Sequence, residues 1–167
     1  ATVTAAKGTA FTTTVDGETY QFVTNASETI TPLNGVYKFS NLTLYEGTLV
    51  TFKYTVDSTD VDQRFIIPSV NADTTTLKVS IQNSASDTTT NTYTLATGVT
   101  SISSTSKVYF LQEMEDGKFE VYFGDDVLGS KLDDGNIVIL EYIVSNKDEA
   151  NGASSFTLSG NIGGFSD

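Results

Sequence analysis

The amino-acid sequence predicts an all-β protein with little helix, with its strands in an antiparallel, β-sandwich-like arrangement. Of its 167 residues, 27 are Thr and 17 are Ser, and Tyr and Phe make up an aromatic fraction of 11%. β-Branched and aromatic side chains fit the pleated, half-buried surface of a sheet. No stretch carries apolar residues at i, i+3, i+4 and i+7 over several turns, which is the pattern of a long amphipathic helix.

The strands are predicted from short runs in which apolar and polar residues alternate or apolar residues cluster. In the first half of the chain these runs are residues 11–15, 20–23, 36–39, 49–56, 65–68 and 77–82. Asp16-Gly17 separates the first two runs and predicts a tight hairpin, and Asn34-Gly35 predicts another turn. Every second residue from Val50 to Val56 is apolar, so this face should point inward. Pro68 closes the fifth run, which is typical of a strand end or an edge strand.

The second half of the chain has a denser set of predicted strands, at residues 107–114, 118–123, 137–144 and 156–158. The run 137–144 is apolar on both faces apart from Glu141, which predicts a central strand.

Domain organisation is predicted from the segment 83–92, which is poor in apolar side chains and typical of a loop. A long hairpin connection is an equally simple interpretation of this segment. We place the main internal boundary in this segment and expect an arm or linker at residues 1–8, followed by two small packed β-subdomains at residues 9–85 and 86–167. The chain starts at Ala1 without an initiator Met and stops in a loop-like stretch, so we expect a piece of a longer gene product.

Missing residue types exclude several classes of function. The chain has no His, Cys or Trp, so it offers no imidazole base, no thiolate nucleophile and no zinc site built from His or Cys. A net charge of −12 and a pI near 4.1 argue against binding to the phosphate backbone of nucleic acids. No apolar run is long enough to cross a bilayer. We therefore predict no nucleic-acid or membrane partner, no cofactor and no metal.

One group of carboxylates could carry chemistry. Its eight members lie close together in the sequence and are Glu113, Glu115, Asp116, Glu120, Asp125, Asp126, Asp133 and Asp134. A glycosidase-like pair, with one carboxyl protonated and the other ionised, is one interpretation. A Ca²⁺ site is a second, since carboxylates and loop carbonyls are hard oxygen ligands. The third and simplest is that these acids build turns with positive φ and point into water, so we predict no catalytic residue.

The stretch from Val108 to Tyr142 carries a more specific pattern: an aromatic-Leu-Gln-Glu strand, a turn, Phe-Gly-Asp-Asp, a further Gly, and a Gly-Asn step into a strand that ends in Tyr. The residues that we assign to this structural motif are Phe123, Gly124, Asp125, Asp126, Gly129, Gly135, Asn136 and Tyr142. The pattern resembles the signature of J-type phage baseplate proteins and of the T-even-type baseplate wedge protein. Leu44-Tyr45-Glu46-Gly47 resembles a weaker element of the same family. The family usually has Gly where this chain has Asp126, and Asp tolerates positive φ at a cost of ~1 kcal/mol.

The resemblance implies a structural subunit, or a domain of one, in the baseplate of a contractile phage tail. Its implied partners are copies of itself and other baseplate wedge proteins, its location is the virion after synthesis in the host cytoplasm, and it is not an enzyme. We expect its contacts at the loop 124–136, the polar segment 146–153 and the N-terminal arm. The alternative is a carbohydrate- or receptor-binding β-module of a surface or tail protein, which needs aromatic side chains on a solvent-exposed face. A carboxylate-based hydrolase is the third hypothesis.

Overall fold

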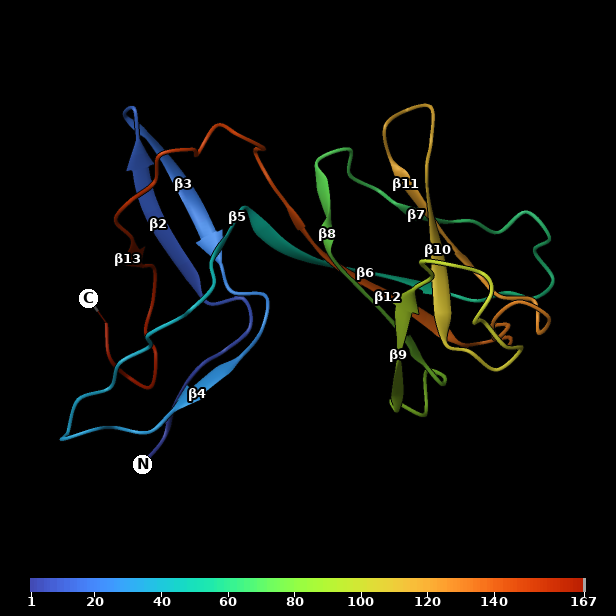
Figure 1. The fold of residues 1–167 in the computed structure, drawn as a ribbon, viewed down its shortest axis with the longest axis horizontal. Helices are drawn as coiled ribbons and strands as arrows, with labels where there is room; N and C mark the ends of the chain where they lie inside the picture. The colour runs from blue at the N-terminus through green and yellow to red at the C-terminus, as the bar shows by residue number, and fades with distance from the viewer. Residues whose placement is uncertain (167) are drawn as a thin grey trace. The chain divides into compact units, whose positions relative to one another are not determined.

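The computed structural model describes residues 1–166, which form thirteen β-strands and no helix (Figure 1). The predicted all-β class is therefore confirmed. Contacts within the chain define two compact units. The terminal unit combines Ala1–Leu49 with the segment from Ile143 onward, and the central unit is Val50–Tyr142. Among the described residues there is no helix with the length and apolar character needed to cross a membrane.

This division differs from the expected subdomains 9–85 and 86–167. β8 (Ala72–Gln82) and β9 (Thr90–Leu95) are paired antiparallel neighbours in one sheet, with Val79 opposite Tyr93. The connection between them is therefore the long hairpin that was the alternative interpretation. The two units are instead separated within β6 (Thr48–Thr55) and β12 (Ile137–Val144), which both cross the division.

The central unit is built on one sheet of seven strands, in the order β6-β12-β8-β9-β10-β11-β7. The strands not yet given are β7 (Phe65–Ile67), β10 (Val108–Glu113) and β11 (Phe119–Phe123). β9 and β10 run parallel, with Val108 opposite Thr94, so the sheet is mixed and not purely antiparallel. A parallel pair needs a crossover connection instead of a tight turn, which the segment between β9 and β10 supplies.

The sheet curls into a nearly closed barrel, because its two outer strands approach each other. β6 and β7 stand at opposite ends of the strand order, yet the Tyr54 hydroxyl donates a hydrogen bond of 2.6 Å to the Ile66 carbonyl. The rings of Tyr54 and Phe65 are also in contact, with centroids 5.7 Å apart. Closure of this kind covers strand edges that would otherwise be open to other chains.

Apolar side chains of several strands fill the barrel core. Val138, Leu140 and Tyr142 of β12 are at most 1% exposed. This burial confirms the central strand predicted from the run 137–144, since β12 lies between β6 and β8. Phe123 joins the core through edge-to-face contacts with other rings, at 5.5 Å from Phe65 and 5.6 Å from Tyr93.

The terminal unit contains two small antiparallel sheets. One pairs β1 (Val3–Ala5) with β4 (Glu28–Ile30), and the other has the order β13-β2-β3-β5. The bounds in the second sheet are β13 (Thr157–Leu158), β2 (Ala10–Val15), β3 (Glu18–Val23) and β5 (Tyr45–Glu46).

In the terminal unit the predicted hairpin turn forms, whereas the predicted N-terminal arm does not. Asp16 and Gly17 have φ of 52° and 89° between the paired residues Val15 and Glu18, which confirms the tight hairpin. Residues 1–8 are not a free arm, because β1 pairs with β4 and buries the side chains of Val3 and Ala5.

The strand expected at 36–39 is absent from the described chain. A single bridge between Leu33 and Val36 closes the Asn34-Gly35 turn. This isolated bridge ends the pairing, so the predicted turn forms and the strand after it does not.

Candidate functional site

The segment 124–136 leaves β11 through a close approach of two glycines. A Cβ on Gly124 would collide with the backbone of Gly129, so only glycine fits at position 124. Gly129 has φ of +87°, a conformation that residues with a Cβ rarely adopt. The segment therefore folds back on itself at its base, and the residues from Asp125 to Leu128 form its tip.

Two aspartates hold this tip. One carboxylate oxygen of Asp125 accepts the backbone N–H groups of Val127 and Leu128 at 3.0 and 2.9 Å, and these two bonds lower the pKa of the Asp125 carboxyl. Asp126 has φ of +67°, and its carboxylate accepts the N–H of Lys131 at 2.9 Å. The position thus has positive φ, which explains why Asp, one of the residues that tolerate this conformation, can stand where the family usually has Gly.

Gly135 and Asn136 return the chain to β12. Gly135 has φ of +77°, and the backbones of both residues pair with Val56 through bonds of 2.9 and 2.8 Å. The Asn136 side chain accepts the N–H of Asp133 at 2.9 Å and donates to the Asn83 carbonyl at 2.8 Å. This asparagine thus connects segments 53 residues apart in the sequence.

The structure does not bring all eight motif residues to one surface. Phe123 and Tyr142 pack in the barrel core, and burial raises the pKa of the Tyr142 hydroxyl. The other six shape the segment 124–136.

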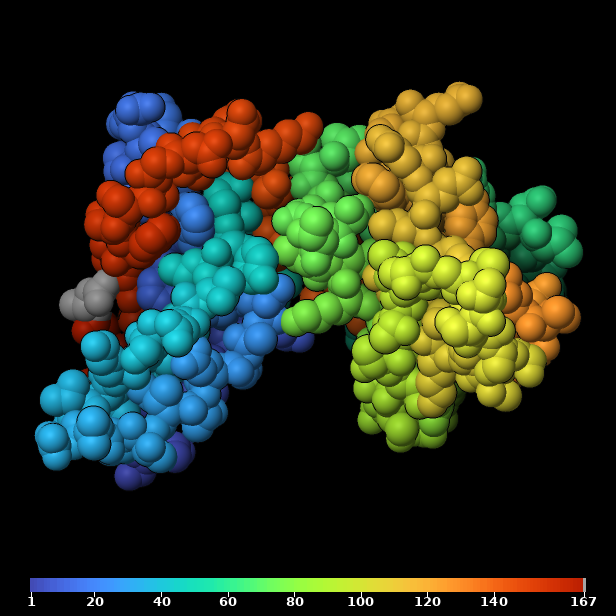
Figure 2. Space-filling view, viewed as in Figure 1, coloured from blue at the N-terminus to red at the C-terminus, as the bar shows by residue number. Residues whose placement is uncertain are grey.

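We use the name loop end for three segments at one end of the barrel: residues 57–63, 97–106 and 124–136. Hydrogen bonds join them: Ser58 N–H to the Asp134 carboxylate at 2.8 Å, Gly129 N–H to the Ser103 carbonyl at 3.1 Å, and Ser130 N–H to the Ser106 carbonyl at 2.9 Å. Figure 2 shows the green, yellow and orange segments side by side on the surface of the central unit.

Each segment of the loop end exposes one valine. Val61 is 92% exposed, Val99 60% and Val127 77%. The same segments carry seven aspartates and a single lysine, Lys131. Sequence reasoning identified the segment 124–136 but missed Val61, although a valine between two aspartates in a polar segment is a signal that could have identified it.

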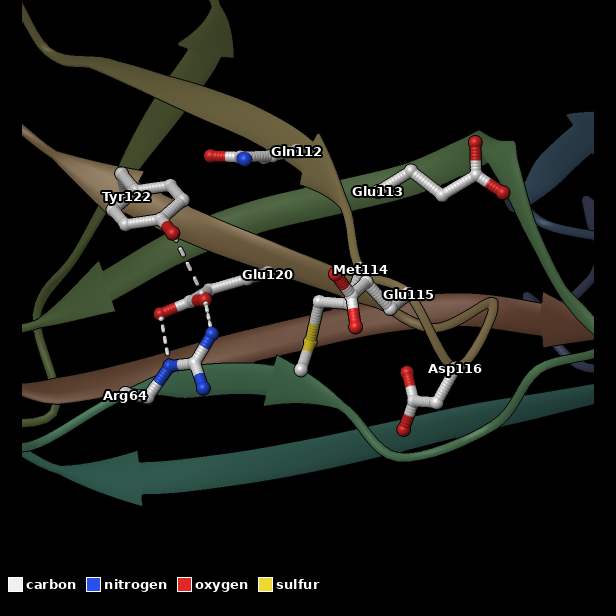
Figure 3. Close-up of a pocket in the computed structure, with 8 residues that line it drawn as sticks. All are labelled: Arg64, Gln112, Glu113, Met114, Glu115, Asp116, Glu120 and Tyr122. Carbon is white, nitrogen blue, oxygen red and sulfur yellow. Dashed lines mark hydrogen bonds and ion pairs between the residues drawn. The ribbon is translucent and has the colours of Figure 1, made fainter.

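The acidic group predicted from the sequence is divided between two places. Asp125, Asp126, Asp133 and Asp134 lie at the loop end, whereas the other four carboxylates line a surface cavity of about 490 Å³ (Figure 3). The residues that line this cavity are Arg64, Gln112, Glu113, Met114, Glu115, Asp116, Glu120 and Tyr122.

Arg64 holds the most buried carboxylate of this cavity. The Arg64 guanidinium donates two hydrogen bonds to Glu120, and the Tyr122 hydroxyl donates a third at 2.9 Å. Glu120 is only 4% exposed, and the Arg64 guanidinium is the largest cause of its lowered pKa. Sequence reasoning missed Arg64, which is the only arginine of the chain.

These geometries favour the turn interpretation of the acidic group. A glycosidase needs one carboxyl with a raised pKa, but the structure lowers the carboxyl pKa of Asp116, Glu120 and Asp125. The Asp116 carboxylate caps its own turn by accepting the N–H of Lys118 at 3.1 Å. In residues 1–166 no group of three or more acidic side chains is arranged to hold a metal ion.

The weaker resemblance at residues 44–47 also has a structural basis, within the terminal unit. The Glu46 carboxylate accepts two bonds of 2.8 Å from Asn146, one from its backbone and one from its side chain. A Cβ on Gly47 would collide with the Val144 carbonyl. These contacts hold the start of the polar segment 146–153 against β5.

A curled β-barrel whose sequence motif shapes a surface segment, and several of whose aspartates accept backbone N–H groups in turns, is typical of a structural domain. A comparison with protein families matches residues 50–153 to the model described as bacteriophage baseplate wedge protein gp6, third domain. The chain belongs to this family, since the match spans more than half of it and includes the whole central unit. No curated protein sequence matches the chain. The family gives the chain a structural role in the phage baseplate, which is part of the virion tail, and confirms the resemblance found in the sequence.

Proposed function

We propose that this chain works as a structural subunit or domain of the baseplate by protein–protein assembly, with the loop end of the barrel as its contact surface. The observation that carries this proposal is the presence of three highly exposed valines on three segments that are hydrogen-bonded to one another. Exposed apolar residues that are scattered singly need no explanation, whereas a binding surface at one end of the barrel requires exposed apolar side chains on the segments that are joined there. The proposed partners are other baseplate wedge proteins and copies of this chain.

Hydrogen bonding within the loop end supports a binding role. A segment that is already ordered loses less conformational entropy when it binds, so more of the apolar contact energy appears as affinity. The aspartates around the valines provide the polar rim that surrounds the apolar centre of most interfaces. Their charge favours partners with lysines or arginines at the matching positions.

The aromatic contacts do not favour the carbohydrate-binding alternative. Such a module needs rings on an exposed strand face. Of the linked rings, Tyr54, Phe65, Phe123 and Tyr93 instead pack against one another in the central unit and are not exposed. Phe52, which contacts Tyr54, is the exposed member of this series at 38%.

Substitution at the tip of the loop end tests the proposal in the phage that encodes this chain. Val127→Asp places a charge on a side chain that is 77% exposed, so the fold should keep its thermal midpoint while the chain is lost from purified tails. The matched control is Val70→Asp, which changes a 51% exposed valine in the turn after β7, at the other end of that strand from the segment 57–63. Immunoblots of purified tails and electron microscopy of baseplates measure incorporation. Wild-type incorporation of Val127→Asp would contradict the role of the loop end, and absence of the native chain from tails would contradict the function itself.

A further inference from the structure

The terminal unit has an apolar cavity of about 500 Å³. All the residues that line it lie outside the segment 50–153 that matches the family. Its lining contains no charged side chain and consists of Val3, Gly35, Val36, Tyr37, Phe39, Leu158, Ile162, Phe165 and Ser166. Val36 and Phe165 at its edge are 63% and 61% exposed. In a chain with 21 acidic residues, this uncharged hollow is a distinct surface.

Two tight turns of the same kind form the rim of this cavity. Leu33 and Val36 exchange backbone bonds of 2.9 and 3.0 Å around Asn34-Gly35, and Ile162 and Phe165 exchange bonds of 2.8 and 3.1 Å. The central residues of both turns have positive φ. The rings of Tyr37 and Phe165 connect the turns at 5.8 Å between centroids. The cavity is therefore formed before any ligand arrives, which is usual for binding sites.

The chain itself carries a projection of the kind that this cavity would accept. Val61 is 92% exposed, more than any other large apolar residue described. Its loop is ordered by hydrogen bonds between residues two positions apart. The Asp57 carboxylate accepts the Thr59 N–H at 2.9 Å, and the Asp60 carboxylate accepts the Asp62 N–H at 3.1 Å. The tip Asp60-Val61-Asp62 thus presents one apolar side chain between two carboxylates on a fixed backbone.

The charges around the two surfaces are complementary. The segments 33–39 and 158–166, which form the cavity, contain one charged residue, the exposed Lys38. Two copies of a chain with a net charge of −12 repel each other at most orientations. If the tip of one copy meets the cavity of another, its carboxylates approach Lys38. In this orientation unlike charges meet.

From these observations, and on the basis of the assembly function proposed above, we infer that the tip Asp60-Val61-Asp62 of one copy docks into the apolar cavity of a second copy. The contact is heterologous, because it joins two different surfaces. Repetition of such a contact produces a ring when its rotation closes and a filament when it does not. A docked valine would fill part of the cavity, and the flanking aspartates would face Lys38.

Cysteine cross-linking identifies the two surfaces directly, since the native chain has no Cys that could interfere. Val61→Cys and Val36→Cys are made as separate variants and mixed under mild oxidation. The mixed disulfide should form at least about 10-fold faster than the disulfide between Val36→Cys and the control Val70→Cys. Equal rates would overturn the inference, and so would a faster disulfide between two copies of Val36→Cys, which would indicate a symmetric contact.

Sedimentation velocity of the purified chain over a range of concentrations measures the strength of the contact. Val61→Asp should weaken self-association by about 10- to 100-fold, the range expected for the loss of one buried valine. Val70→Asp is the control and should leave self-association unchanged, because it also places a charge on an exposed valine but lies outside the loop end. A chain that stays monomeric, or associates equally well as Val61→Asp, overturns this inference. The assembly function would still stand if the native chain is present in purified tails.

Discussion

Gly124 and Asp126 show how single positions determine the shape of the segment 124–136. Gly124 is required because its neighbour across the segment is backbone, which cannot move aside as a flexible side chain can. The hydrogen bond that the Asp126 carboxylate accepts from the Lys131 N–H offsets part of the free-energy cost of its left-handed conformation. The first position depends on space and the second on backbone preference, so the two respond differently to substitution.

Gly124→Ala should destabilise the chain by about 3 kcal/mol, because the added methyl group forces two backbone segments apart. Gly135→Ala is the matched control. It also changes a glycine of this segment, but the space around it is open and its φ of +77° costs only about 1 kcal/mol. Urea denaturation of both variants measures the difference. Equal losses of stability in the two variants would show that Gly124 is required for its backbone conformation and not for its close approach to Gly129.

Among the elements, β6 and β7 depend on contacts that no strand pattern encodes. They are the outer strands of the seven-stranded order and are bridged by the Tyr54 hydroxyl and the Tyr54–Phe65 ring contact. β7 has only three residues and pairs on its other side with β11. A strand this short has few backbone bonds of its own, so the contact with Tyr54 matters for its order.

Tyr54→Phe should therefore lower the free energy of unfolding by about 1 kcal/mol and speed amide hydrogen exchange in β7. The control is Tyr37→Phe, which removes a hydroxyl bonded at 3.0 Å to the carbonyl of Ala1 in the terminal unit. It should leave exchange in β7 unchanged. Unaltered β7 exchange in Tyr54→Phe would mean that ring packing alone closes the barrel.

For the molecule as a whole, the distribution of titratable groups predicts how stability responds to pH. The chain has no His, so few groups titrate between pH 5 and 8. Five carboxyl groups have a pKa below the ordinary values of 3.8 for Asp and 4.5 for Glu, each because of hydrogen bonds that stabilise the charged form. They are Asp57, Asp87, Asp116, Glu120 and Asp125.

The unfolded chain binds protons at these five carboxyls at a higher pH than the folded chain does, so stability is lost as the pH falls through this range. The thermal midpoint should be nearly constant from about pH 5.5 to 8 and should fall below about pH 4.5. Scanning calorimetry over a pH series measures it. Glu120→Gln should lower the free energy of unfolding by about 1 to 2 kcal/mol at pH 7, a value kept small because the Arg64 side chain is half exposed to solvent. The variant should also lose less of its thermal midpoint on acidification than the native chain does. A midpoint that rises on acidification would show instead that relief of the net negative charge dominates.

Local sequence was sufficient for the features of this protein that depend on neighbouring residues. Asp16-Gly17 formed its predicted hairpin, and the apolar run 137–144 became the central strand. Each follows from the backbone preference of a residue or from the side-chain period of a strand. The family pattern was also readable, because its glycines and aspartates stand at fixed spacing within one stretch of chain.

Features that depend on residues far apart in the chain required the folded structure. Periodicity in one segment does not state which other segment pairs with it, so the barrel order, the parallel pair β9–β10 and the union of both chain ends in one unit could not be derived. The same holds for Val61, Val99 and Val127, which lie up to 66 positions apart in the sequence. Hydrogen bonds between loops bring them to one end of the barrel. Turns are encoded by the residues that make them, whereas a surface is formed by segments that meet only after long-range strand pairing.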